Sequence, residues 1–266
     1  MIDIEGFKQY LYEEELSQNT IDGYVQGITQ YAKLYDNISK QNIIEFKKSL
    51  MERWKPQTVN NRITAVLRYC KFKGIPMTCK HIKEAKKTYI ENVLTVEQYE
   101  RLMAGLKNEN RMRWYYNILL LAKTGMRISE ALRVTKKDIV KGSVTMHAKA
   151  HMRTIYFPKS LKEELAPYMS EFKDSEIIMK NRSGKPLTSR GVAEELHKFG
   201  KKFDIPQEVM HPHAFRHFFA IEFLKRNNNI ALLADLLGHG SVNVTQIYLR
   251  QSQEQQKKEI DDAVDW

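Results

Sequence analysis

Leu236-Leu-Gly-His239-Gly-Ser-Val-Asn-Val-Thr-Gln-Ile-Tyr248 is the stretch of this sequence that decides the fold. A short apolar helix is expected to end at its first glycine, a histidine follows, and a tyrosine comes nine residues after that histidine. Taken alone, the stretch has an ordinary structural explanation, because glycine is a common helix C-cap and a tyrosine is most often a partly buried core residue. Its meaning depends on what accompanies it elsewhere in the chain.

Two segments farther upstream combine the same residue types. Thr124-Gly-Met-Arg127-Ile-Ser-Glu130 follows a long apolar helix, and its arginine opens the next helix. His211-Pro-His213-Ala-Phe-Arg216-His217-Phe stands at the start of a further helix. Each has a simple structural interpretation. In the first segment, the glycine can be a helix C-cap and Arg127 a surface charge. In the second, His213 and Arg216 can be neighbours on an exposed helix face.

In this order and spacing, the three segments resemble the signature of the tyrosine recombinase, or phage integrase, family over about residues 93–250. Met146-His-Ala-Lys149-Ala-His-Met-Arg153-Thr-Ile-Tyr-Phe-Pro158 resembles the lysine-bearing hairpin of that family, with alanines where glycines usually flank the lysine. The layout is similar to the Xer-like minimal two-domain form, with no arm-binding domain expected before residue 1. The resemblance implies a mainly α fold, in which a four-helix core-binding (SAM-like) domain precedes a mostly α catalytic domain with a small antiparallel sheet.

The resemblance implies that Tyr248 attacks a DNA phosphate. Neutral tyrosine, with a pKa of about 10, is a poor nucleophile at neutral pH and needs a positive pocket or a nearby base. His213 is placed either to bond the phosphate or to accept the tyrosine's proton. The 5′ sugar oxygen leaves as a strongly basic alkoxide, so a general acid is needed, and Lys149 is the candidate.

The negative charge that develops on the phosphate oxygens also needs partners. Arg127 and Arg216 suit this role, because guanidinium groups are always charged and donate in a planar fork, and His239 would add a third donor. Glu130 and His217 are interpreted as supporting residues: Glu130 would orient Arg127, and His217 would orient the helix that carries it. A purely structural role is the alternative for each. No metal or cofactor is expected, since no carboxylate cluster indicates metal-assisted chemistry.

Composition agrees with a DNA partner. The chain has 266 residues, enough for two modest domains, and a formal net charge of +11 with a pI near 9.4. A membrane partner is disfavoured, because the longest charge-free, largely apolar run, Tyr115–Ala122, is far too short to span a bilayer. The N-terminus resembles no export signal, and Cys70 and Cys79 are expected to be reduced, so we expect a cytoplasmic protein.

The charge is unevenly distributed along the chain. Residues 1–52 carry five Lys or Arg against nine Asp or Glu, whereas residues 53–87 carry ten against Glu84 alone. Such a run can be merely a solvated surface, but a single-sign surface of this density favours a polyanion. The expected DNA contacts in this region are Arg53, Lys55, Asn60, Asn61, Arg62, Arg68, Lys71, Lys73, Lys83, Lys86 and Lys87.

Hydrophobic periodicity places the elements. It predicts four helices in the first part of the chain: one over about 3–16, a second that begins near Ser17, a third with its N-cap at Ser39, and a fourth over about 57–73. A capping box at Thr95 marks the start of the second domain. Helices are predicted there over 95–106, 111–123, 189–203, 212–226, 229–237 and 242–250. Alternation predicts strands at Asp138–Val140, Ser143–Ala148 and Arg153–Phe157. The expected divisions are 1–73, a basic linker 74–93, a catalytic domain 94–250 and a tail 251–266.

By resemblance, the expected partner is double-stranded DNA with paired inverted sites. A protein that is monomeric in solution would assemble on it as a tetramer, with the tail docking on a neighbouring protomer, and accessory factors are possible. Two alternatives stay open: a topoisomerase-like enzyme that nicks and reseals without partner exchange, and a non-catalytic DNA-binding protein of the same fold.

Overall fold

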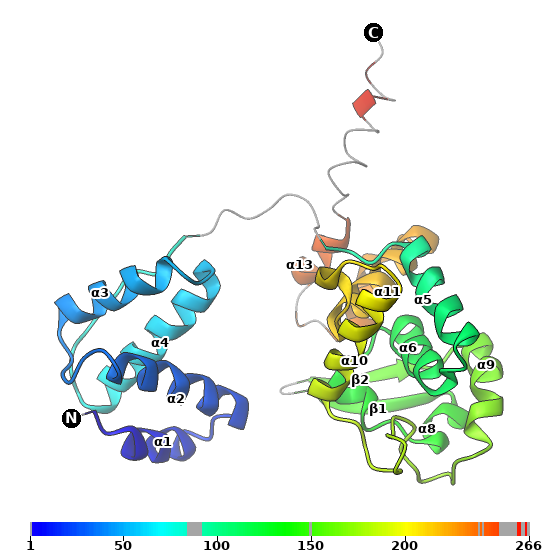
Figure 1. Ribbon diagram of the computed structural model, residues 1–266, viewed down its shortest axis with the longest axis horizontal. Coiled ribbons are helices and arrows are strands. Elements are labelled where there is room, and N and C mark those ends of the chain that lie inside the picture. The colour runs from blue at the N-terminus through cyan, green and yellow to red at the C-terminus, as the bar shows by residue number, and fades with distance from the viewer. Residues whose placement is uncertain are drawn as a thin grey trace. The chain divides into compact units, whose positions relative to one another are not determined.

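The computed structural model describes residues 2–83, 92–148, 151–238, 240, 242–249, 260, 261 and 264. The chain divides into two compact units, Met1–Lys86 and Lys87–Trp266, and Figure 1 shows the elements of each. Within the described ranges, no helix is both long enough and apolar enough to cross a membrane.

The N-terminal unit contains the four predicted helices, which are α1 (Ile4–Glu13), α2 (Gln18–Ala32), α3 (Lys40–Met51) and α4 (Pro56–Phe72). The predicted N-cap is confirmed, because the Ser39 side chain accepts a hydrogen bond of 3.1 Å from the Asn42 amide. Helices α2 and α4 cross closely at Gly27, where a Cβ would lie only 2.4 Å from the Cβ of Ala65. Their apolar faces enclose a core that includes Phe7, Tyr31 and Phe46.

Residues 74–83 belong to this unit rather than to the linker expected over 74–93. Gly74 ends α4 with a φ of +65°, as predicted, and Ile75, Met77 and Cys79 then pack against the helical core at every second position. Asn60 holds the end of this segment, since its amide group donates to the Ile82 carbonyl at 3.0 Å and accepts from the Ile82 amide at 2.8 Å. The alternating apolar residues drive this packing, which the charge of the flanking lysines obscures in the sequence.

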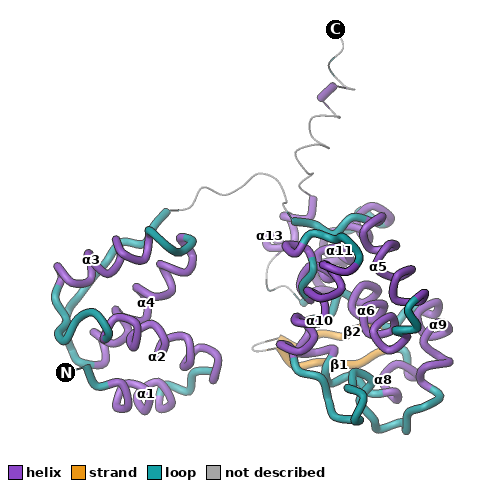
Figure 2. Tube along the Cα trace, in the orientation of Figure 1, coloured by secondary structure: helices purple, strands orange, loops and turns teal. Residues whose placement is uncertain are grey.

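The second unit is mostly helical, and Figure 2 shows its short hairpin among the helices. Its helices are α5 (Val96–Asn108), α6 (Met112–Thr124), α7 (Ile128–Ala131), α8 (Lys136–Lys141), α9 (Lys159–Met169), α10 (Ser189–Lys202), α11 (Pro212–Arg226), α12 (Ile230–Leu237) and α13 (Val242–Thr245), with 3-10 turns η1 (Gln207–Val209) and η2 (Gln246–Leu249). Strands β1 (Ser143–Ala148) and β2 (His151–Tyr156) form an antiparallel pair in which Ser143 faces Tyr156. The predicted mainly α fold with a small antiparallel sheet is confirmed.

The strand predicted at Asp138–Val140 is wrong, because these residues lie in α8. Thr135 and Asp138 form a capping box at its start, with the Thr135 amide donating to the Asp138 carboxylate at 2.9 Å. Gly142 ends the helix with a φ of +89°. The capping pair therefore outweighs the local alternation of apolar residues.

Helix α6 lies at the centre of the second unit and is buried on nearly every face. It packs against α5, α9 and α11, and it ends at Gly125 in the left-handed conformation, with a φ of +60°. A smaller cluster, made by Ala220, Leu224, Leu233, Leu237 and Tyr248, joins α11, α12 and η2. The core around α6 and this smaller cluster together hold in place the segments that carry the sequence motifs. The predicted tail helix, 251–266, lies almost entirely outside the described residues.

Candidate active site

Arg127 stands at the joint between α6 and α7. Its backbone amide donates to Glu130 Oε2 at 2.6 Å, and its guanidinium donates to Glu130 Oε1 at 3.3 Å. The Glu130 side chain is only 2% exposed, whereas the Arg127 side chain is 36% exposed. Glu130 therefore holds Arg127 in place and leaves part of the guanidinium exposed.

Arg216 comes from the first turns of α11. That helix begins with Pro212, and the His211 ring accepts a hydrogen bond of 3.2 Å from the Ala214 amide. Arg216 is 1% exposed and donates to the carbonyls of Gly125 at 2.8 Å and Leu237 at 2.5 Å. Burial, together with the charges of nearby arginines, lowers its pKa to about 10, so it remains a cation at neutral pH.

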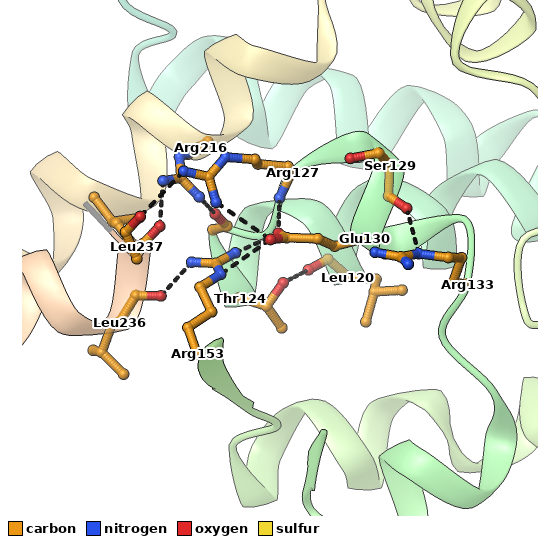
Figure 3. A network of polar contacts seen from close by, with 12 residues as sticks. Leu120, Thr124, Arg127, Ser129, Glu130, Arg133, Arg153, Arg216, Leu236 and Leu237 are labelled. Carbon is orange, nitrogen blue, oxygen red and sulfur yellow. Dashed lines mark hydrogen bonds and ion pairs between the residues drawn. The ribbon is translucent and has the colours of Figure 1, made fainter. Parts of the chain in front are cut away.

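The two arginines converge on the turn that ends α12, as Figure 3 shows. Arg216 donates to the Leu237 carbonyl, and Arg127 donates to the next carbonyl, that of Gly238, at 3.3 Å. Gly238 has a φ of +62°, which turns the chain sharply after the helix. Three segments far apart in the sequence thus meet at one point, and two guanidinium groups approach it.

Tyr248 is buried beside this cluster, with 7% of its surface exposed. Its hydroxyl lies 3.0 Å from Nδ1 of His217, and the His217 ring stands edge-on to the exposed His213 ring, with centroids 4.4 Å apart. Burial raises the pKa of Tyr248, although the positive charges of Arg216 and Arg127 act in the opposite direction. The hydroxyl is therefore neutral at physiological pH and has an imidazole nitrogen within hydrogen-bonding distance.

His213 lies on the same face of α11 as Arg216 and His217, which are three and four residues away. Desolvation, assisted by the charge of Arg216, lowers the pKa of His213, so the neutral imidazole predominates at pH 7. Lys149 and His239, which were predicted to be catalytic, lie outside the described residues.

Arg153 is a member of this cluster that the sequence analysis missed as a functional residue. Its Nε donates to Glu130 Oε1 at 3.1 Å, a second guanidinium nitrogen bonds Glu130 Oε2, and the third bonds the Leu236 carbonyl. The alternation of residues along β2 could have identified Arg153 from the sequence. Arg153 lies on the buried face of the strand with Ile155, whereas the neighbouring Met152 is exposed. A charged residue on a buried strand face requires a partner, and Glu130 provides it.

The predicted DNA contacts, apart from Lys87, lie in the N-terminal unit, and several have partners within the protein. Arg68 pairs with Glu14 at 3.4 Å, and Lys73 pairs with Asp3 at 2.8 Å. Asn60 is occupied by the Ile82 backbone, as described above. Arg62 donates to the Gly23 carbonyl at 3.4 Å, and Asn61 accepts from Gln57 at 3.1 Å.

The remaining predicted contacts are the exposed residues Arg53, Lys55, Lys71 and Lys83, whereas Lys86 and Lys87 lie outside the described residues. No group of three or more His, Cys, Asp or Glu residues with metal-binding geometry occurs in the part of the chain that the structure describes.

Comparisons with known proteins agree with the geometry. The phage integrase family model matches residues 92–255. The chain is 27% identical over 271 residues to tyrosine recombinase XerA of Pyrococcus furiosus, covering 98% of this chain and 93% of that protein. It is 27% identical over 282 residues to tyrosine recombinase XerC of Bacillus subtilis, covering 94% and 92%. Its fold is similar to that of the Tn1549 transposon integrase in complex with transposon right end DNA, with a TM-score of 0.74, 16% identity and coverage of 98% and 99%.

Proposed function

The chain belongs to the phage integrase family and is a tyrosine-type site-specific DNA recombinase, and from this premise we propose that it cuts and rejoins DNA through a 3′-phosphotyrosine on Tyr248. The observation that carries the proposal is the convergence of Arg127 and Arg216 on the turn that ends α12. Two guanidinium groups at one point form a site for a single phosphate, because each donates several hydrogen bonds and keeps its charge.

Cleavage begins when the Tyr248 oxygen attacks the phosphorus of the scissile phosphodiester. The new O–P bond forms as the bond from phosphorus to the 5′ oxygen breaks, and Arg127 and Arg216 stabilise the charge on the non-bridging oxygens. Preorganised donors of this kind contribute about 3 kcal/mol each to transition-state stabilisation. The hydroxyl proton passes to an imidazole, and His217 lies within hydrogen-bonding distance of that hydroxyl.

The leaving 5′ oxygen receives a proton, which we assign to Lys149, with His239 as a further donor to the phosphate. The products are a phosphotyrosine at the 3′ end and a free 5′ hydroxyl. Because the phosphoester bond is exchanged and not hydrolysed, attack by a 5′ hydroxyl reverses the step without a nucleotide cofactor.

The proposed partner is double-stranded DNA with paired inverted sites, bound by a tetramer that exchanges strands through a Holliday junction. The similarity to the Tn1549 integrase, which was solved with transposon DNA, supports the DNA partner. The basic run over 53–87 supplies phosphate contacts in this scheme, and the tail over 251–266 docks on a neighbouring protomer. Integration or excision of a mobile element and Xer-like resolution use the same chemistry.

Trapping on DNA tests the nucleophile. Wild type, Tyr248→Phe and the control Tyr156→Phe, which alters an exposed tyrosine on β2, are incubated with nicked sites taken from DNA flanking the gene. Denaturing gels should show a covalent adduct with wild type and Tyr156→Phe and none with Tyr248→Phe. An adduct that persists in Tyr248→Phe would reject the assignment of the nucleophile.

A plasmid with two sites separates recombination from simple nicking and resealing. Recombinant products support the proposed function, whereas relaxation of supercoils without recombinants supports a topoisomerase-like enzyme. DNA binding with neither product supports a non-catalytic binding protein, since salt-sensitive binding is expected of all three.

A further inference from the structure

We propose that Arg153 is a positioning residue of the active site, which keeps Arg127 available to the scissile phosphate by neutralising Glu130. This inference rests on the proposed function. Arg153 and Glu130 have side chains that are each 2% exposed, and they form a two-pronged ion pair at the base of the cluster in Figure 3. All three guanidinium nitrogens of Arg153 bond protein groups, so the residue supports the site from behind and does not contact DNA.

Glu130 has two arginine partners, and its bonds to them differ: both carboxylate oxygens bond Arg153, whereas the Arg127 guanidinium reaches only Oε1, at 3.3 Å. A buried carboxylate without Arg153 would hold Arg127 as its sole counter-ion, because a buried charge requires a partner. Arg153 therefore lets Glu130 orient Arg127 without neutralising it.

Arg153 also bonds the Leu236 carbonyl, and a Cβ at Gly238 would lie 2.3 Å from its Cδ. The side chain of Arg153 thus passes directly against the turn whose carbonyl at Gly238 accepts from Arg127. One residue on β2 consequently fixes both the acid and the carbonyl that orient Arg127.

If Arg153 acts through Arg127, its loss matters only where the phosphate carries a negative charge on its non-bridging oxygens. A DNA site with a neutral methylphosphonate at the scissile position lacks that charge. Misfolding or a general loosening of the unit would instead slow cleavage of both substrates equally.

The experiment compares wild type, Arg153→Met and the control Arg133→Met on both substrates. Arg133 is a matched control because it lies just after α7 and donates to the Ser129 carbonyl at 3.1 Å, away from the cluster. For Arg153→Met, which leaves Arg127 as the sole counter-ion of Glu130, the rate of adduct formation on ordinary DNA should fall about tenfold to a hundredfold, as expected for a misplaced catalytic group. The defect should shrink to about threefold or less on the methylphosphonate, with the Kd for DNA unchanged. Arg133→Met should match wild type on both.

A second variant guards against loss of folding. Glu130→Gln combined with Arg153→Met removes both buried charges, and its urea midpoint shows whether the unit folds. A folded double variant that cleaves ordinary DNA faster than Arg153→Met supports the inference, because it has no carboxylate that could hold Arg127. Equal defects of Arg153→Met on the two substrates, a wild-type rate for Arg153→Met on ordinary DNA, or a folded double variant no faster than Arg153→Met would overturn it. If wild type itself forms no Tyr248-dependent adduct, the proposed function fails, and that result is distinct from an adduct that does not depend on Arg153.

Discussion

The hydroxyl of Tyr248 lies 3.0 Å from Nδ1 of His217, the residue that follows the buried Arg216 on α11. The sequence suggested His213 as the residue that bonds the phosphate or accepts the tyrosine's proton, and His217 as a supporting residue. In the resting protein, His217 is the histidine that contacts the hydroxyl, and His213 packs edge-on against it nearer the solvent. When the imidazole of His217 carries its proton on Nε2, its Nδ1 accepts a hydrogen bond from the Tyr248 hydroxyl and is placed to take the hydroxyl proton.

Replacing His217 by phenylalanine keeps a ring in the same space and removes the hydrogen bond to Tyr248. We expect adduct formation to slow by about a hundredfold or more, which is the usual contribution of a positioned acid or base. Single-turnover cleavage of a nicked site measures the rate, and a binding titration should show an unchanged Kd. His197→Phe, at an exposed position on α10, is the control. A wild-type rate in His217→Phe would remove this histidine from the mechanism.

Gly238→Ala tests the close passage of Arg153 beneath the turn. Two penalties are expected: a left-handed φ of +62°, and a Cβ that would lie 2.3 Å from Arg153 Cδ. Gly184→Ala separates them, because Gly184 has a φ of +76° but nothing within 4 Å of its added Cβ. Strain alone costs about 1–2 kcal/mol, and overpacking adds about 1–3 kcal/mol at Gly238. Urea denaturation of the two variants measures the difference, and equal losses would show that the contact with Arg153 relaxes freely.

Glu130 predicts a dependence of stability on pH. Burial alone would raise the pKa of this carboxyl group, but bonds from Arg153 and the Arg127 amide, together with both positive charges, lower it overall. A lowered pKa means that the stabilisation is fully present above the unfolded value of about 4.3 and is lost as pH falls through the folded value. Below about pH 4, the free energy of unfolding of wild type should therefore fall more steeply than that of Glu130→Gln, by up to about 1.4 kcal/mol per pH unit.

Fluorescence can follow that unfolding in the second unit alone. The chain has three tryptophans, Trp54, Trp114 and Trp266. In a Trp54→Phe/Trp266→Phe background, only Trp114, which is buried in the second unit, reports. Parallel pH profiles for this background with and without Glu130→Gln would mean that the carboxyl group has the same pKa folded and unfolded.

Much of the fold was predictable because local rules decide it. The capping side chains of Ser39 and Thr95 and the glycine at position 125 act within one turn of their own helices, so the sequence alone indicates those boundaries. Asp138–Val140 was misassigned because alternation and a capping pair compete in the same short stretch. Local pattern is a weak guide where two local signals disagree.

The sequence motifs indicate candidate residues for the site but not the contacts between them. Arg127, Arg216 and Tyr248 stand in recognisable motifs, but their shared turn depends on contacts between residues about 20 to 110 positions apart. Asn60 illustrates the same limit, since its position in a basic stretch suggested DNA, whereas its amide is occupied by the backbone of Ile82. Spacing identifies which residues have suitable chemistry, and only tertiary contacts show how that chemistry is used.

The salt dependence of DNA binding distinguishes lysines that are ion-paired within the protein from lysines that are available to contact phosphates. Lys73, the C-cap of α4, bonds Asp3 at 2.8 Å and lies 4.4 Å from the Phe72 ring centre. Lys55, at the start of the same helix, and Lys71, in its last turn, are exposed and have no ion pair among the described residues. Each phosphate contact that is lost should reduce the slope of log K against log salt by about 0.9. We expect that reduction for Lys55→Gln and for Lys71→Gln, and an almost unchanged slope for Lys73→Gln. Fluorescence anisotropy over a range of potassium chloride concentrations gives the three slopes, and a full reduction in Lys73→Gln alone would show that Lys73 contacts DNA despite its ion pair with Asp3.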